Sequence, residues 1–193
     1  MQNNKPVLPW KTLSSSMALS EKWFRVRKDV VQLPSGKIVD DYFVWEAPHI
    51  VLAIPVTAEG KFVLVKQYRH GIGEIMYQFP AGAVDNGESL AQAARREMEE
   101  EAGFVSEKLI HLGTNAPYAS KVTSVEDMFL APDATDRGHR NYDEQEESEV
   151  VLLSKDALLE LIDSKKIQMA GTLLAATFLA LRYLEKTEKD KPA

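Results

Sequence analysis

The stretch REMEEEAGF, residues 96–104, places four glutamates in five positions: Glu97, Glu99, Glu100 and Glu101. Carboxylates three or four residues apart on a helix repel one another, and a carboxylate beside apolar surface costs free energy unless a positive charge compensates. A hard divalent cation such as Mg²⁺ takes one or two carboxylates and keeps waters and substrate phosphate oxygens as its other ligands. The stretch therefore predicts either a metal site or an acidic face in solvent.

A helical pattern over residues 89–102 separates these glutamates. With a step of about 100° per residue, Glu100 and Glu101 fall within about 60° of Glu97. These three lie along one margin of the apolar stripe, whereas Glu99 falls on the opposite side and is expected in solvent. Arg96 can pair with Glu100, but one guanidinium does not balance three carboxylates. This placement favours a metal site. The stripe itself consists of Leu90, Ala91, Ala94, Met98 and Ala102.

The loop PAGAVDNGE, residues 80–88, must position the start of this helix. Gly82 and Gly87 allow sharp turns and a close approach of the backbone to a ligand. Ser89, or Asn86 slightly earlier, is a candidate N-cap, and Glu88 lies near the positive end of the helix dipole. Because this loop leads directly into the helix, we interpret the two together as one candidate site.

The fixed positions of loop and helix form a single spaced pattern. It reads Gly82, five residues, Glu88, seven residues, Arg96-Glu97-Met98, one residue, Glu100-Glu101, one residue, Gly103-Phe104. This pattern resembles the Nudix box in full. The resemblance implies a mixed α/β (α+β) fold with a mixed β-sheet sandwiched between helices, and hydrolysis of a nucleoside diphosphate linked to another moiety.

The resemblance also implies roles for individual residues. Glu97 and Glu101 would be direct Mg²⁺ ligands, Glu100 would act directly or through water, and the backbone carbonyl of Ala81 would complete the site. Mn²⁺ could substitute for Mg²⁺. Such metal ions neutralise the pyrophosphate, polarise a phosphorus–oxygen bond and lower the pKa of the attacking water. The remaining motif positions would be structural: Gly82, Glu88, Arg96 and Gly103.

Residues 20–185 resemble the ADP-ribose and nucleoside-diphosphate-sugar pyrophosphatase branch of this family. In that branch an N-terminal β segment builds a homodimer whose two chains share each substrate site. The segment EKWFRVRKDVVQLPSGKIVDDYFVWE is similar to it. In VLVKQYRHG, Arg69 would contact the pyrophosphate or the terminal sugar; the alternative is an ordinary surface arginine.

Aromatic residues of the N-terminal segment are candidates for stacking on the base. Trp23 and Tyr42 are the first choices, because aromatic faces bind purines with little demand on sequence. Trp45 or Phe43 could serve instead. The alternative for all of them is a place in the hairpin core or a dimer contact.

The acidic stretch NYDEQEESEVVLLS is similar to the loop that supplies the general base in this branch. Position within the match indicates Glu144, with Glu146 and Glu147 as neighbours that could exchange roles. The alternative is a solvated acidic loop, because a base must lie within hydrogen-bond reach of its water.

The substrate is left open among several nucleotides. ADP-ribose is expected first, but NAPYAS offers Pro117 without the glycine that usually follows the box in this branch. GDP-mannose or a broader set of nucleotide sugars is therefore an alternative. Further alternatives are a housecleaning hydrolase of nucleoside triphosphates or dinucleoside polyphosphates, and a sensor that binds a nucleotide without cleaving it.

Composition excludes several classes of partner and site. The chain has 193 residues, 45% hydrophobic and 27% charged, as expected for a globular α/β protein. Its net charge of −6 argues against nucleic acid or an anionic membrane as partner. With no cysteine there are no disulfides, Cys-zinc sites or thiol nucleophiles. Without a signal-like segment, and with its longest apolar run short of the roughly 20 residues of a membrane span, the protein is expected in the cytoplasm.

The chain divides into three parts in this interpretation. Residues 1–47 are a polar leader and a β extension for dimerisation and part of the substrate site, 48–186 the Nudix catalytic domain, and 187–193 a polar tail. A Pro-Ser-Gly turn predicts a hairpin in the extension, and AEGK predicts two tightly joined strands in the domain. Strands are expected at 22–33, 38–47, 49–57, 62–71, 75–79, 108–113, 125–131 and 150–154, and helices at 155–166 and 170–186.

Overall fold

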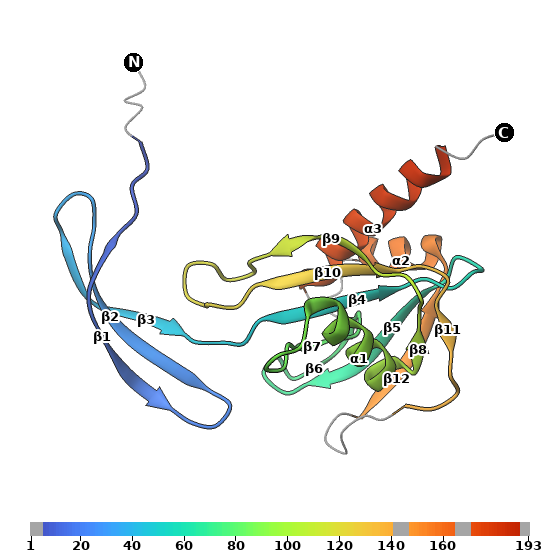
Figure 1. The fold of residues 1–193 in the computed structure, drawn as a ribbon, viewed down its shortest axis with the longest axis horizontal. Helices are drawn as coiled ribbons and strands as arrows, with labels where there is room; N and C mark the ends of the chain where they lie inside the picture. Colours follow the sequence, from blue (N-terminus) through green and yellow to red (C-terminus); the bar gives the residue numbers. More distant parts are fainter. Residues whose placement is uncertain (1–5, 141–146, 165–170, 190–193) are drawn as a thin grey trace. The chain divides into compact units, whose positions relative to one another are not determined.

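A computed structural model describes residues 6–140, 147–164 and 171–189 (Figure 1). The chain forms two compact units, one of Met1–Pro48 with Tyr118–Ser124, the other of His49–Pro117 with Val125–Ala193. Residues 118–124 thus belong to the N-terminal unit although some seventy residues of sequence lie between them and Pro48. Local sequence patterns do not predict this grouping. Within the described ranges, none of the helices combines the length and hydropathy needed to cross a bilayer.

The N-terminal unit is built on an antiparallel sheet in the order β1-β2-β3. The predicted hairpin is present as β2 (Arg25–Gln32) and β3 (Ile38–Trp45), closed by a hydrogen bond of 2.8 Å from Leu33 N to Lys37 O. A polar leader was predicted before the hairpin, but residues Lys11–Ser20 of that leader form strand β1, which pairs with β2 along its length. Its serines interrupt the apolar alternation from which strands are predicted, and every residue of β1 is exposed.

The second unit contains a mixed sheet in the order β7-β4-β10-β9. Strands β4 (Ile50–Pro55) and β10 (Glu126–Ala131) run parallel, and β7 (Ala81–Ala83) and β9 (Ile110–Asn115) pair antiparallel at the two edges. A short pair joins β8 (Phe104–Val105) to β11 (Thr135–Asp136).

A further sheet of this unit has the order β12-β5-β6. It contains β12 (Ser148–Leu153), β5 (Phe62–Arg69) and β6 (Glu74–Gln78). The turn between β4 and β5 is as tight as predicted, but β4 and β5 do not pair as strands in the described residues; an isolated bridge joins Val56, just after β4, to Phe62. β5 instead pairs with β6 and β12, which brings residues far apart in sequence beside one another.

Helices cover both faces of these sheets, because the strands alternate their apolar side chains between two cores. On β4, Val51 and Ala53 pack against α1 (Leu90–Ala102), while Leu52 and Ile54 face the other core, with α2 (Lys155–Asp163) and α3 (Gly171–Lys189). The predicted fold, a mixed sheet between helices with an N-terminal β extension, is confirmed.

Candidate active site

Helix α1 is fixed at both ends by its own sequence. Ser89 is the N-cap: its Oγ accepts from Gln92 N at 3.3 Å and its N–H donates to Gln92 Oε1 at 2.9 Å, a complete capping box. At the other end Gly103 has φ +74° and donates its N–H to Glu99 O, closing the helix. The caps set where α1 begins and ends, while its buried residues Ala93, Ala94, Met98 and Ala102 determine which side faces the sheet.

The glutamates of α1 lie as the helical pattern predicts. Glu99 is exposed, Glu97 and Glu100 are half-buried, and Glu101 is buried with 8% of its surface exposed. The backbone N–H of Ala81 donates to Glu101 Oε2 at 2.9 Å. This bond ties the buried carboxylate to the loop that enters α1.

Arg96 is the centre of an ion-pair network on α1. Its Nη1 donates to Glu97 Oε1 at 2.6 Å and to Glu100 Oε2 at 3.1 Å. Its Nε and Nη2 bind both oxygens of Glu88 at 3.1 and 3.0 Å, and Nη2 also donates to Ala83 O. The hydrogen bonds to Glu88 raise the pKa of Arg96 against the effect of burial, and the same bonds lower the pKa of Glu88. Arg96 therefore joins loop and helix, as expected of a structural brace.

Gly82 lets the loop backbone approach the carboxylate of Glu97. A Cβ placed on Gly82 would stand 2.1 Å from Glu97 Oε1. No side chain fits there without displacing that carboxylate. Ala81 and Gly82 thus bring loop backbone against two of the three predicted metal ligands.

Arg69 ends β5 on the side of the sheet that faces α1. Val65 belongs to the core against α1, and Arg69 lies four residues further along the same strand, hence on the same side. Its Nε and Nη2 donate to Gln78 Oε1 at 3.0 and 2.5 Å. Sequence reasoning missed Gln78, and the signal that could have found it is its position three residues before Ala81.

The predicted general bases Glu144 and Glu146 lie outside the described residues. Glu147 is exposed and directly precedes β12, whose Ser148 pairs with Gln67 of β5. The end of the acidic stretch is therefore attached beside the strand that ends in Arg69.

Comparison with known families decides the classification. A model described as "NUDIX domain" matches residues 47–173. The chain belongs to the Nudix hydrolase family. A second model, "Nucleoside diphosphate sugar hydrolase N-terminal domain", matches residues 10–45. Both matches confirm the resemblance seen in the sequence.

Individual relatives of this Nudix hydrolase match nearly the whole chain. "ADP-ribose pyrophosphatase" of Bacillus subtilis is 31% identical over 93% of this chain and 97% of its own length. "Methanol dehydrogenase activator" of Bacillus methanolicus is 29% identical over 89% of this chain and 93% of its own. A solved structure, "Crystal structure of ADP compounds hydrolase", shares the fold with a TM-score of 0.83 at 22% identity, covering 95% of this chain and 98% of that one.

Nudix hydrolases generally use divalent metal ions. Glu97, Glu100 and Glu101 offer oxygen ligands, the type that hard divalent cations prefer, and Gly82 leaves room for close approach. In the described part of the chain no three acidic or histidine residues are arranged as a metal cage, and Glu97 and Glu100 both bind Arg96 Nη1. A carboxylate accepts at several lone-pair positions, so these bonds do not exhaust it. The residues fit a divalent cation in donor type.

The aromatic residues predicted to stack on a base lie in the N-terminal unit and differ in solvent exposure and in the contacts that they already make. Trp23 is 83% exposed, with Lys22 Nζ at 4.5 Å from its ring centroid. Tyr42 is already engaged: its hydroxyl donates to Ser120 O, Lys121 Nζ lies 3.6 Å from its ring centroid, and Trp10 packs edge-on against it. Phe43 and Trp45 are 44% and 38% exposed. Trp23 presents the most accessible ring of the four.

A second polar cluster of the Nudix domain was not predicted. Asp127 of β10 is 4% exposed and accepts hydrogen bonds from His49 Nε2 at 2.6 Å, His111 Nε2 at 2.5 Å and Thr114 Oγ1 at 2.7 Å. Burial raises the pKa of Asp127, but these three hydrogen bonds outweigh burial, so the pKa is lowered. The cluster joins β9, β10 and the start of β4, and His111 has a structural partner that spacing did not indicate.

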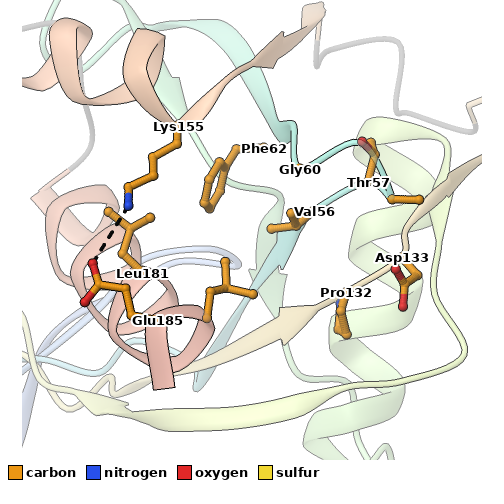
Figure 2. Close-up of a pocket in the computed structure, with 11 residues that line it drawn as sticks. Val56, Thr57, Gly60, Phe62, Pro132, Asp133, Lys155, Leu181 and Glu185 are labelled. Atoms are coloured by element: carbon orange, nitrogen blue, oxygen red, sulfur yellow. Dashed lines mark ion pairs between the residues drawn. The ribbon is translucent and has the colours of Figure 1, made fainter. Parts of the chain in front are cut away.

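A pocket of about 350 Å³ lies beside α3, and its lining residues Val56 and Phe62 belong to the core that packs against α3 rather than to the core against α1 (Figure 2). Val56, Phe62 and Leu181 are among its apolar lining residues, and Lys155 and Glu185, which also line it, form an ion pair of 3.8 Å (Figure 2). None of the predicted site residues lines it. The pocket is separate from the carboxylates of α1.

Proposed function

We propose that this Nudix hydrolase cleaves the pyrophosphate bond of ADP-ribose or a related nucleoside diphosphate sugar, with Mg²⁺ as its metal and Mn²⁺ able to replace it. The products would be a nucleoside monophosphate and a sugar phosphate. The observation that carries the proposal is the set of three carboxylates on one edge of α1, with loop backbone held against two of them. The match of residues 10–45 to a nucleoside diphosphate sugar hydrolase domain, and the relative named for ADP-ribose, support the substrate class.

Each residue of the site has a part in this reaction. Glu97, Glu100 and Glu101 would hold the metal, Ala81 and Gly82 would keep loop backbone beside it, and Arg69 would bind a phosphate. When bound, the metal neutralises charge on the pyrophosphate and lowers the pKa of a water.

The hydrolysis itself needs one water and one base. Water oxygen attacks phosphorus, the bridging phosphorus–oxygen bond breaks, and the base takes the proton. We propose Glu144 as this base, with Glu146 and Glu147 as alternatives on the same stretch. Glu147 is attached beside the Arg69 strand, which supports a base from this stretch. The base must come within about 3 Å of the water oxygen, directly or through one more water.

A panel of nucleotides tests the substrate class. ADP-ribose, GDP-mannose and dGTP are incubated with Mg²⁺ or Mn²⁺, and products are separated by anion-exchange chromatography. We expect ADP-ribose or another nucleotide sugar to be turned over faster than dGTP, with one monophosphate and one sugar phosphate per cleavage. Faster turnover of dGTP would contradict the proposal, as would tight ADP-ribose binding with no product after long incubation.

The variant Glu101→Gln tests the carboxylate site. It should abolish metal-dependent turnover and leave thermal unfolding, followed by circular dichroism, close to that of the wild type. Glu99→Gln is the matched control, since Glu99 is an exposed carboxylate of the same helix and should be dispensable. Undiminished turnover in Glu101→Gln would contradict the assignment of Glu101 as a metal ligand.

We also propose a homodimer built by the N-terminal unit. Strand β1 is an edge strand, and it carries Leu13, Met17 and Leu19 at 44% exposure each. Exposed apolar side chains on an unpaired edge are typical of a partner surface. Light scattering after size-exclusion chromatography should give twice the monomer mass, and the double change Leu13→Glu with Met17→Glu should halve it. A monomeric wild type would contradict the dimer and would leave Trp23 without its proposed stacking role.

A further inference from the structure

The side-chain amide of Gln78 is buried, and its oxygen accepts hydrogen bonds whereas its nitrogen has no acceptor among the described residues. Gln78 ends β6 and has 6% of its surface exposed. Its Nε2 is fully buried and has no hydrogen-bond acceptor among the described residues. A buried N–H without an acceptor is costly, and such groups in native proteins commonly have a functional reason.

The orientation of this amide is determined by its neighbour. Arg69 carries donors alone, and both its Nε and its Nη2 point at one atom of Gln78, at 3.0 and 2.5 Å. That atom must be the amide oxygen. Rotating the amide by half a turn would set N–H against N–H, so the nitrogen is the half that faces away from Arg69.

Gln78 also lies on the catalytic face of the sheet. It pairs directly with Val65, and opposed residues of antiparallel strands share a face. Val65 packs in the core against α1, which carries the carboxylates. Three residues after Gln78, Ala81 N–H binds Glu101. The residue that carries the unmet donor therefore contacts Arg69 and lies three residues before the loop backbone that binds Glu101.

The arrangement suits an anion. Gln78 Oε1 accepts from the edge of the Arg69 guanidinium formed by Nε and Nη2, and leaves Nη1, which has no partner among the described residues, as a further donor. A phosphate offers acceptors only, so it can receive hydrogen bonds from both groups at once.

We propose that Gln78 is a substrate-positioning residue whose Nε2–H donates to a phosphate oxygen of the nucleotide sugar that Arg69 binds. This inference rests on the proposed function. In the same contact, Gln78 Oε1 aims the guanidinium at that phosphate.

A double-mutant cycle separates donation to the substrate from mere orientation of Arg69. Binding of ADP-ribose is measured by calorimetry in EDTA, where no metal supports turnover, for wild type, Gln78→Met, Arg69→Met and the double variant. We expect Gln78→Met to raise Kd about tenfold in the wild-type background, and again in the Arg69→Met background. If Gln78→Met has no effect once Arg69 is gone, Gln78 acts through Arg69 alone and the proposal is overturned.

Gln78→Glu keeps the experiment decisive if the methionine variant does not fold. A carboxylate still accepts both bonds from Arg69 but has no donor to offer. We expect normal thermal unfolding and a Kd for ADP-ribose at least about tenfold higher, with KM raised more than kcat is lowered when Mg²⁺ is present. An unchanged Kd in this variant overturns the proposal. Failure of the wild type to cleave ADP-ribose or any other nucleotide sugar with Mg²⁺ present would instead reject the proposed function.

Discussion

The carboxylate of Glu97 occupies the space that a side chain on residue 82 would need. A Cβ on Gly82 would stand 2.1 Å from Glu97 Oε1 and 2.2 Å from its Cδ, well inside van der Waals contact. The same carboxylate is held at 2.6 Å by Arg96 Nη1. Loop and helix are therefore fitted to each other at a predicted metal ligand.

Replacing Gly82 by alanine should impair catalysis without unfolding the protein. The new methyl group displaces the far end of a flexible side chain, so the free energy of unfolding should change by less than about 1 kcal/mol. Displacing Glu97 by about 1 Å should lower kcat/KM about 100-fold. Gly71→Ala is the control, because a Cβ there meets nothing within 4 Å. Wild-type activity in Gly82→Ala would show that Glu97 needs no such placement.

Removing the guanidinium of Arg96 should destabilise the loop and helix together. Arg96→Met leaves Glu88, Glu97 and Glu100 without their shared partner, and we expect about 2 kcal/mol lower free energy of unfolding. Added Mg²⁺ should raise Tm more in this variant than in the wild type, because a cation then relieves carboxylate repulsion. Arg182→Met, which removes an exposed 4.0 Å ion pair, should cost less than about 1 kcal/mol. Equal losses in urea titrations of the two variants would contradict the brace role.

Local periodicity predicted the carboxylate edge of α1 because a helix fixes which side chains share a side. The exposed Glu99 and the buried Glu101 follow from spacing alone, and the structure selects Ser89 from the two predicted N-caps, Ser89 and Asn86. The two cores follow from alternation along the strands in the same way.

Contacts set by strand register could not be predicted in the same way. The bond between Arg69 and Gln78 depends on how β5 and β6 pair, and the bonds of Asp127 depend on three segments meeting. Strand β1 was missed because its backbone pairing, rather than apolar burial, makes it a strand. Such features depend on which segments become neighbours, which no short window of sequence contains.

Replacing Asp127 by asparagine should remove an acid-sensitive part of the stability. An amide cannot accept from His49, His111 and Thr114 together, and we expect a loss of about 2 to 3 kcal/mol at pH 7. Because the folded pKa of Asp127 is lowered, its contribution is present above the unfolded pKa of about 3.9 and is lost as pH falls through the folded value.

The pH series that checks this uses urea unfolding of wild type and Asp127→Asn from pH 7 to pH 3. The difference between the two should shrink as the pH falls below about 4. Asp40→Asn, which changes an exposed carboxylate on β3, should show no such difference at any pH. A gap that widens below about pH 4 would contradict the assigned direction.

Replacing Gly103 by alanine should cost more stability than the same change at Gly138. Both glycines have a positive φ, +74° and +76°, which an alanine adopts at a cost of about 1 kcal/mol. At Gly138 a Cβ meets nothing within 4 Å, whereas at Gly103 it would stand 2.8 Å from His139 O and 3.0 Å from Arg140 Cγ. We therefore expect Gly103→Ala to lose at least about 1 kcal/mol more in urea titrations, and to lower turnover by shifting the end of α1 that carries Glu101. Equal losses at the two positions would mean that the backbone beside Gly103 yields freely, and that the end of α1 is less firmly held than these contacts imply.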